Sequence, residues 1–189
     1  VGLVMSKYPS LVIASHQAAM NFSNLMYAFP LSISSAMAII ISYEFGARRM
    51  DAVKSYSKLG RLTALGFSIF TLIFLYFLRY DLAELYGREP EFLRMTAIFM
   101  TYSLFFQVAD VFAAPLQGIL RGYKDTKVPF YLGVLAYWGI TFPVGFLLEK
   151  VTGLGPYSYW IGLIASLIVS GLCYQWRLNR IVKRYESQL

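Results

Sequence analysis

The chain has 189 residues, of which 58% are hydrophobic and 14% are charged, and its formal net charge is +7. Soluble domains carry about 25% charged residues, so this composition excludes an ordinary soluble domain. The positive charge is concentrated in a few connectors between apolar stretches, a distribution that argues against a nucleic-acid partner.

Five apolar stretches are long enough to cross a bilayer, which takes about 20 residues in a helix. They cover approximately residues 18–42, 60–78, 93–118, 128–148 and 157–176. Backbone groups inside hydrocarbon must form their hydrogen bonds within each spanning segment. The expected fold is therefore an all-α integral membrane protein, a helical bundle in which residues 1–189 form one membrane domain.

The basic residues predict an orientation for this bundle. Twelve of the seventeen lysines and arginines lie in the connectors after the first and third spans and in the tail after the fifth. The other five are mixed with acidic residues in the alternate connectors. Because cytoplasmic loops carry the excess of Lys and Arg, we expect the C-terminus to be cytoplasmic and the N-terminus to lie outside.

The sequence begins at Val1, and residues 1–6 resemble the last part of an apolar helix. We expect a truncated sequence that holds the end of one helix and five complete ones, and no secretory signal is recognisable. Cys173 is the single cysteine, so no internal disulfide can form. With one histidine elsewhere in the chain, no metal-ligand spacing exists and no metal site is expected.

The first span carries polar residues in its outer half. His16 is interpreted as an interfacial or capping residue. Asn24 and Tyr27 are three residues apart and therefore share a helix face. The Tyr27 ring could attract a cationic drug or ion, and packing within the bundle with a bonded hydroxyl is at least as compatible with the sequence.

The connector that follows is basic, and residues 51–59 could form a short amphipathic helix on the membrane surface. The second span, roughly from Gly60 to Leu78, is rich in Phe and Leu and has no Asp, Glu, Lys or Arg inside it beyond Arg61 at its start, so we expect it to face lipid.

The third span contains one carboxylate, Asp110, with Gln107 three residues earlier on the same helical face. A carboxylate in the middle of a membrane helix is unfavourable by a few kcal/mol and usually faces a water-filled or protein-lined interior. Asp110 is therefore the first candidate for binding Na⁺ or H⁺. The alternative is a structural acid that is hydrogen-bonded to a neighbouring helix, and Gln107 could bind the same ion or bridge helices.

The last two spans add a bend and an aromatic cluster. Pro143 predicts a bend in the fourth span, and Tyr157, Tyr159 and Trp160 are expected to anchor the fifth span at the interface. No nucleotide, hydrolase or metal motif occurs along the chain, so an enzyme is not expected.

Several segments resemble the multidrug and toxic compound extrusion (MATE) family, in its NorM branch. They are SHQAAMNFSNLMYAFPLSISSA, FGARRMDAVK, FFQVADVFAAPLQGILRGYKDTKVPF, YWGITFPVGFLL and GPYSYWIGL. The resemblance covers essentially the whole chain, and the LRGYKDTKVP connector is its most specific part. It implies the C-terminal six-helix lobe of a twelve-helix transporter, with the end of helix seven followed by helices eight to twelve.

The resemblance also implies a function. Members of this family are antiporters that export cationic, amphipathic drugs in exchange for Na⁺ or H⁺, with no other cofactor, across the cytoplasmic (inner) membrane of bacteria. Asp110 matches the family's cation-binding aspartate, and Tyr27 matches an aromatic residue near the cation or drug. Phe106 stands where some members have a tyrosine. The family's acidic residue of helix seven would lie before Val1, so the resemblance implies an N-terminal half as partner.

Two other functions are alternatives for this sequence. A lipid-linked-sugar flippase shares the architecture but usually carries basic residues in its cavity, and the interiors of the predicted spans contain none. A non-transporting membrane scaffold of five or six helices would need no intramembrane carboxylate.

Overall fold

The computed structural model describes residues 2–186, apart from the side chains of Leu3 and Glu186. Every regular element in this range is helical, as predicted. The elements are α1 (Gly2–Met5), α2 (Ser10–Gly46), α3 (Met50–Glu84), α4 (Pro90–Gly122), α5 (Lys127–Ala136), the π-helical turn η1 (Tyr137–Thr141), α6 (Phe142–Thr152) and α7 (Tyr157–Glu186).

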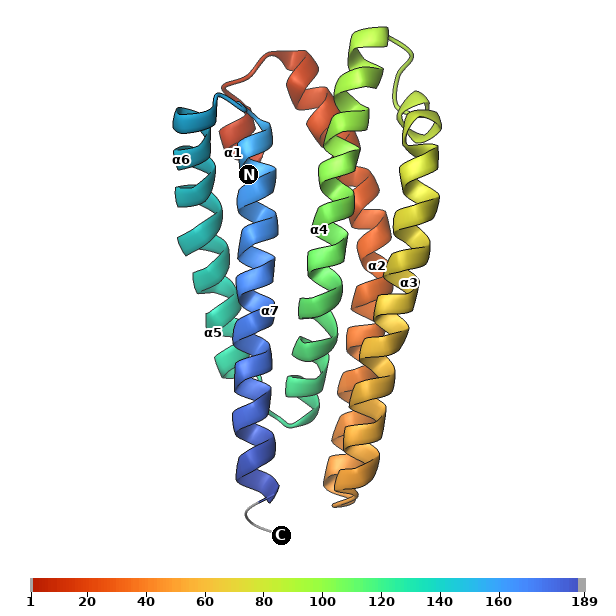
Figure 1. The fold of residues 1–189 in the computed structure, drawn as a ribbon, viewed down its shortest axis with the longest axis vertical. Helices are drawn as coiled ribbons and strands as arrows, with labels where there is room; N and C mark the ends of the chain where they lie inside the picture. The colour runs from red at the N-terminus through yellow and green to blue at the C-terminus, as the bar shows by residue number, and fades with distance from the viewer. Residues whose placement is uncertain (1, 187–189) are drawn as a thin grey trace.

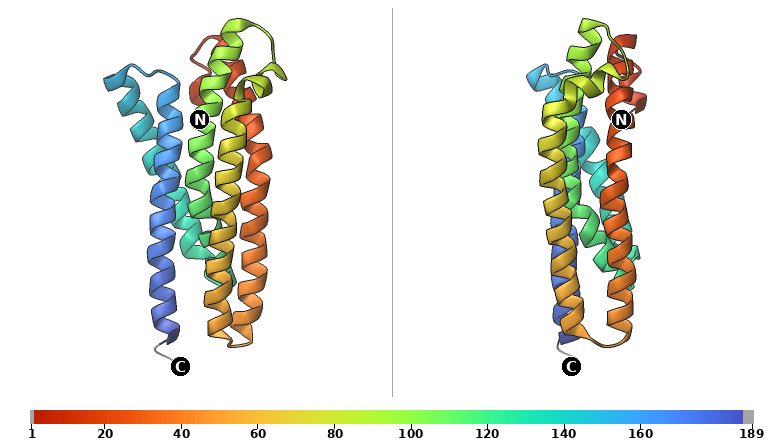
Figure 2. Two further views of the ribbon diagram at one scale, coloured as in Figure 1. Left: turned by 45° about the vertical axis from the view of Figure 1, so that its right-hand side comes forward. Right: turned by 90° about the vertical axis from the view of Figure 1, so that its right-hand side faces the viewer.

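Five of these segments are long and apolar enough to cross a membrane: α2, α3, α4, the α5–η1–α6 unit and α7. They run roughly parallel to one another, and α4 stands between α2 and α3 on one side and α7 on the other (Figure 1). The α5–η1–α6 unit packs on α7 and forms the opposite edge of the bundle, as the turned views also show (Figure 2). The expectation of an all-α bundle with five long apolar helices is confirmed.

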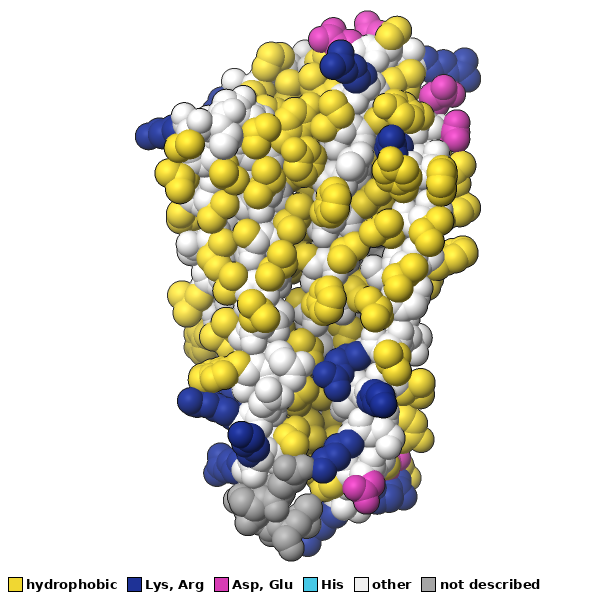
Figure 3. All heavy atoms as spheres, in the orientation of Figure 1, with side chains coloured by type: hydrophobic (Ala, Val, Ile, Leu, Met, Phe, Trp, Pro, Cys, Tyr) yellow, Lys and Arg dark blue, Asp and Glu magenta, His cyan; other side chains and the backbone are white. Residues whose placement is uncertain are grey.

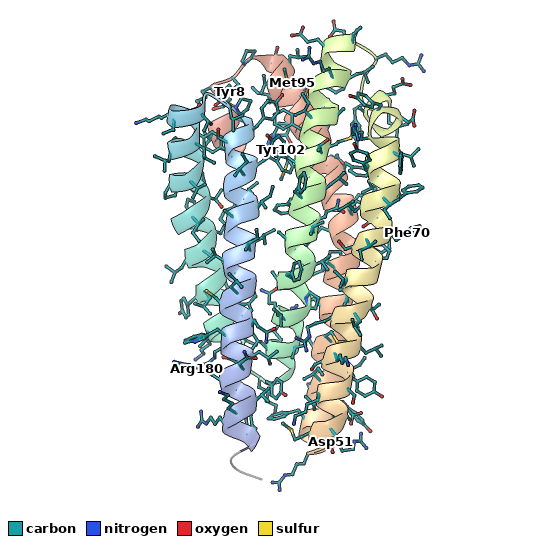
Figure 4. All side chains as sticks on the ribbon, viewed as in Figure 1. Tyr8, Asp51, Phe70, Met95, Tyr102 and Arg180 are labelled. Atoms are coloured by element: carbon teal, nitrogen blue, oxygen red, sulfur yellow. The ribbon has the colours of Figure 1, made fainter. Side chains whose placement is uncertain are left out.

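Because α4 lies at the centre of the bundle, a larger share of its residues is buried than in α3. In its most apolar window, 56% of the α4 residues are buried, against 22% for α3. Large apolar side chains of α3, such as Ile69 and Phe74, are more than half exposed, and Phe70 points away from the bundle (Figure 4). The surface of α3 is therefore apolar and exposed, and its contact with lipid stays a prediction.

One sequence interpretation is wrong. Residues 51–59 do not form a separate surface helix, because α3 runs without a break from Met50 to Glu84. No proline interrupts this segment, and Gly60 serves packing rather than termination. A Cβ atom at Gly60 would lie 2.1 Å from the Met37 sulfur of α2, so the missing side chain allows the two helices to approach closely.

A glycine pair sets the contact between α2 and α4. Gly118 and Gly122 are four residues apart on one face of α4, the spacing that allows membrane helices to pack closely. A Cβ atom at Gly118 would lie 2.2 Å from the Ser34 carbonyl oxygen, and one at Gly122 would lie 2.5 Å from Ile41 Cβ. Arg121 lies between them in sequence and donates a 2.7 Å hydrogen bond to the Ser34 hydroxyl. The two backbones are therefore in direct contact.

At the position of the predicted bend, the fourth span contains the π-helical turn η1, which ends two residues before Pro143. A π turn adds one residue to the helical ladder and often marks functional sites. The turn packs on α7, where a Cβ atom at Gly162 would lie 2.4 Å from the Thr141 carbonyl oxygen. The bend is thus held by backbone contact with the neighbouring helix.

The aromatic and histidine predictions for the outer ends also need correction. Tyr159 and Trp160 are fully buried rather than interfacial, and His16 is 2% exposed. The Trp160 indole N–H donates to His16 Nδ1 at 3.2 Å, and the edge of the imidazole meets the Phe99 ring. These residues form a core cluster that joins α2, α4 and α7, because each large side chain faces the bundle at this level.

An ion-pair cluster joins the start of α2 to the last spans. Lys7 Nζ donates to both carboxylate oxygens of Glu149 at 2.7 Å and to the Tyr159 hydroxyl at 3.3 Å. The Tyr159 hydroxyl donates to Glu149 at 2.6 Å, and the Tyr8 hydroxyl donates to the same carboxylate. Burial raises the pKa of Tyr8 to about 12, so its hydroxyl remains a donor at neutral pH.

A pH-dependent contribution of Lys7 to stability follows. The hydrogen bond to Glu149 raises the pKa of Lys7 above its ordinary 10.5. The stabilisation is therefore complete below about pH 10.5 and is lost as the pH rises through the folded-state pKa. We expect Lys7→Gln to lower the free energy of unfolding by less than about 1 kcal/mol, because half-exposed pairs are weak. The difference should be constant from pH 7 to 10 and shrink above it in detergent-unfolding titrations.

Lys150→Gln is the matched control, since Lys150 is an exposed neighbour of Glu149 on α6. A difference between Lys7→Gln and the unsubstituted chain that already disappears between pH 7 and 9 would contradict this assignment.

Candidate functional site

Asp110 is buried at the middle of the central helix. Its side chain is 7% exposed, and its Oδ2 atom has no hydrogen-bond partner among the described residues. If Asp110 were only a structural acid, it would accept a hydrogen bond from a Ser, Thr, Tyr or Asn of another helix. An unpaired buried polar atom is unfavourable by roughly 1–3 kcal/mol, so the arrangement suits a group that acquires its partner from outside the fold.

Asp110 lines a cavity of about 180 Å³ between α2, α4, the α5–η1–α6 unit and α7. Residues with oxygen-bearing side chains, from four elements, line this cavity. They are Tyr27, Asp110, Gln117, Tyr137, Ser166, Ser170 and Tyr174. The cavity therefore combines one carboxylate with neutral hydroxyl and amide oxygens, and its lining contains no Lys or Arg among the described residues.

The local helical structure positions the residues that line each side of the cavity. Gln117 lies seven residues after Asp110 and so projects from the same face of α4 two turns later. Tyr137 belongs to the π-helical turn, and Tyr174 comes from α7. A Cβ atom at Gly133 would lie 2.6 Å from the Tyr174 hydroxyl oxygen, so the glycine leaves the space that this phenol occupies.

The structure brings together two of the four predicted site residues. Asp110 and Tyr27 line the same cavity, and Tyr27 is 39% exposed, which leaves part of its ring accessible. Gln107 shares the helix with Asp110 but does not line the cavity, and its buried Nε2 atom has no partner among the described residues. Asn24 is exposed on α2 and also lies outside the cavity.

Sequence reasoning missed most of the neutral oxygens. For Gln117, the seven-residue spacing from Asp110 was a usable signal. Ser166, Ser170 and Tyr174 also share a helical spacing of four, but small and aromatic residues are common in membrane helices, so their pattern alone does not identify a site. Tyr137 could not be assigned because the π-helical turn alters which residues face the bundle.

This arrangement can exchange a small cation or a proton. A carboxylate that is surrounded by hydroxyl oxygens matches the oxygen ligands that hard cations prefer. Within residues 2–186, no group of three His, Cys, Asp or Glu side chains could hold a metal ion. Asp110 is the one carboxylate among the described residues that line this cavity.

Comparison with known proteins is consistent with a membrane transporter. The family model MatE matches residues 1–147. The chain is 66% identical over 187 residues to the "Probable multidrug resistance protein NorM" of Streptococcus pneumoniae (strain ATCC BAA-255 / R6), covering 99% of this chain and 41% of that protein. It is 44% identical over 188 residues to the protein of the same name from Bacillus subtilis (strain 168), covering 100% and 42%.

The fold is also found among solved structures. The eukaryotic MATE transporter AtDTX14 superposes with a TM-score of 0.83 at 18% identity, covering 96% of this chain and 42% of that one. The chain thus spans about two fifths of the length of the relatives that it matches. From the family match and these similarities, the chain belongs to the MatE family, a family of transporters rather than enzymes, and is a multi-pass membrane protein of the NorM type.

Proposed function

We propose that this chain is the C-terminal lobe of an antiporter that exports cationic, amphipathic drugs in exchange for Na⁺ or H⁺. The observation that carries the proposal is Asp110, a buried carboxylate without a partner for its Oδ2 atom among the described residues, in a cavity lined by neutral oxygens. Such intramembrane acids mark ion pathways in transporters. The names of the S. pneumoniae and B. subtilis relatives, which refer to multidrug resistance, support the export of drugs.

A polar face of α2 is evidence that a second half of the transporter packs beside this chain. Gln17, Asn21, Asn24, Ser32 and Ser35 are all exposed, and their spacing places them on one helix face. Exposed amides within a membrane span are unfavourable toward hydrocarbon. We propose that this face meets the N-terminal half of the transporter across a water-filled drug pathway, with Asn24 and Tyr27 as drug contacts.

The exchange follows from charge. With Asp110 ionised, the cavity attracts Na⁺ or H⁺, and binding neutralises the carboxylate. The transporter has an outward-open and an inward-open conformation, and the charged and the neutralised Asp110 carboxylate stabilise different ones. Binding of the ion therefore shifts the equilibrium between the two conformations. We place the C-terminus in the cytoplasm, because the basic connectors lie at that end of the bundle.

A chimaera tests the proposal. The matching segment of the S. pneumoniae relative is replaced by this chain, and ethidium accumulation is measured in cells that lack other efflux pumps. We expect the chimaera to lower accumulation as the intact relative does, because 66% of the aligned residues are identical. Collapse of the Na⁺ gradient or of the pH gradient then identifies the coupling ion.

The intact relative is the positive control, and a chimaera with the segment of the B. subtilis relative, 44% identical to this chain, controls for the splice. If the splice control exports ethidium and this chimaera reaches the membrane but does not, the proposal is wrong.

A further inference from the structure

A second cavity, unrelated to Asp110, lies between α3 and α7 at the end of the bundle where α7 finishes. Its volume is about 400 Å³, and its lining combines three cations with polar and apolar groups. The lining residues are Lys54, Ser57, Arg61, Tyr123, Gln175, Leu178, Asn179, Val182 and Lys183. In the space-filling view, Lys and Arg side chains gather over the lower part of α3, beside a hollow with hydrophobic side chains at its base (Figure 3).

An apolar groove continues from this cavity toward the middle of the membrane. It has a volume of about 330 Å³ and shares Arg61 and Gln175 with the basic cavity. Lys58 lies at its mouth, and its other walls are aliphatic and aromatic. These walls are Leu62, Leu65, Val111, Phe112 and Leu116. The two spaces together form one site that is cationic at the end of the bundle and apolar toward its centre.

Arg61 is held across the junction of the two spaces. Its Nε donates to the Ser57 carbonyl oxygen at 3.1 Å, and its Nη1 donates to the Gln175 side-chain oxygen of α7 at 3.3 Å. Gln175 in turn donates to Asn179 at 2.8 Å. These bonds fix the guanidinium where α3 and α7 both pack on α4.

The charge in this site is of one sign. Neither lining contains an Asp or Glu among the described residues. At the same end of the bundle, Glu44 is paired with Arg49 and Asp125 with Arg177, both at 2.6 Å. The carboxylate of Asp51 lies at the foot of α3, outside both linings (Figure 4). An anion is therefore the complementary ligand.

The depth of the site matches a lipid. Arg61 is eleven residues after the start of α3, roughly 16 Å along the helix axis at 1.5 Å per residue. The helix has 35 residues and extends well beyond a hydrocarbon core that is about 30 Å thick. Lys54, Lys58 and Arg61 therefore lie at headgroup level, while Leu62 and Leu65 begin the apolar region.

We infer that the α3/α7 cleft binds an anionic phospholipid. The phosphate lies among Lys58, Arg61 and Lys183, and one acyl chain follows the groove past Phe112. Basic pockets between membrane helices are the usual sites for anionic headgroups. The bound lipid fills the space between α3 and α7 and adds to the direct contact that Arg61 and Gln175 make between these helices.

The test uses the full chain in detergent and counts bound lipids by native mass spectrometry. The probes are dioleoylphosphatidylglycerol, dioleoylphosphatidylcholine and glycerol 3-phosphate. We expect one phosphatidylglycerol to bind more tightly than phosphatidylcholine. Because each basic residue contributes about 1 kcal/mol, or roughly fivefold, the double variant Lys58→Gln/Arg61→Gln should weaken this binding by about 25-fold.

Lys127→Gln/Arg180→Gln is the matched control. It removes the same charge from the same end of the bundle, and Arg180 packs over the Trp176 ring and points away from α3 (Figure 4). We expect this control to bind phosphatidylglycerol as the unsubstituted chain does. Equal losses in both double variants would reveal a general surface potential and overturn the inference, as would equal binding of the two lipids.

The apolar groove has its own test. Phe112, which is 59% exposed, can be replaced by alanine with little effect on folding. Phe112→Ala should weaken phosphatidylglycerol binding severalfold and leave glycerol 3-phosphate binding unchanged. Should glycerol 3-phosphate bind as tightly as the lipid, the occupant is a soluble phosphate and the lipid assignment fails.

Discussion

Asp110→Asn is expected to abolish drug export by the chimaera. Asparagine keeps the shape of the side chain but cannot carry the negative charge that attracts Na⁺ or be neutralised by H⁺. The ethidium accumulation of the variant should match that of cells without the pump, at least a tenfold loss of efflux rate, while its amount in the membrane is unchanged. Retention of folding is expected because Oδ2 has no protein partner among the described residues to lose.

Asp51→Asn provides the matched control. It also removes one carboxylate from the chain, but Asp51 is exposed at the start of α3 and lies outside the cavity. We expect this variant to export normally. Full export by Asp110→Asn, with both proteins present at the same level, would show that Asp110 does not couple an ion to export.

Gly118→Ala is expected to destabilise the bundle more than any other glycine-to-alanine change in a spanning helix. The added Cβ atom would lie 2.2 Å from the Ser34 carbonyl oxygen and 2.8 Å from its carbonyl carbon. Backbone atoms cannot rotate away as a side chain can, so α2 and α4 must separate. Overpacking of this kind lowers the free energy of unfolding by about 1–3 kcal/mol, measurable in detergent-unfolding titrations by circular dichroism.

Gly66→Ala separates this effect from helix propensity. Gly66 lies in α3, where no atom would come within 4 Å of the added Cβ. In a helix interior, alanine is favoured over glycine by roughly 0.5–1 kcal/mol, so this variant should be as stable as the unsubstituted chain or slightly more stable. A similar loss in both variants would show that the contact at Ser34 is not the cause.

Several features of the fold followed from local sequence. The number and apolar character of the long helices were predictable because a bilayer requires each segment to satisfy its own backbone. The helices also extend beyond the apolar stretches. The helix α2 covers Ser10–Gly46 where the apolar stretch is 18–42, since helices continue past the hydrocarbon until a turn stops them. For the same reason α3 begins at Met50 and includes the basic residues before Gly60.

Only part of the candidate site could likewise be predicted from the sequence. Asp110 was identifiable from sequence because a lone carboxylate in an apolar run is rare and unfavourable. Tyr27 was indicated by its aromatic ring and then by the family resemblance, and it lines the same cavity. Asn24 and Gln107 were chosen by their spacing along one helix, and spacing does not reveal which face a neighbouring helix covers.

The sequence by itself determined that this protein is a bundle of membrane helices with one carboxylate at its centre. Both properties depend on the solvation of single segments, which composition records directly. Only the tertiary structure decided that His16 and Trp160 form a buried hydrogen bond and that Tyr174 and Asp110 line one cavity. The close contact of α2 and α4 at Gly118 was also decided there. These pairings depend on how helices distant in sequence rotate and pack against one another, and no local pattern encodes that rotation.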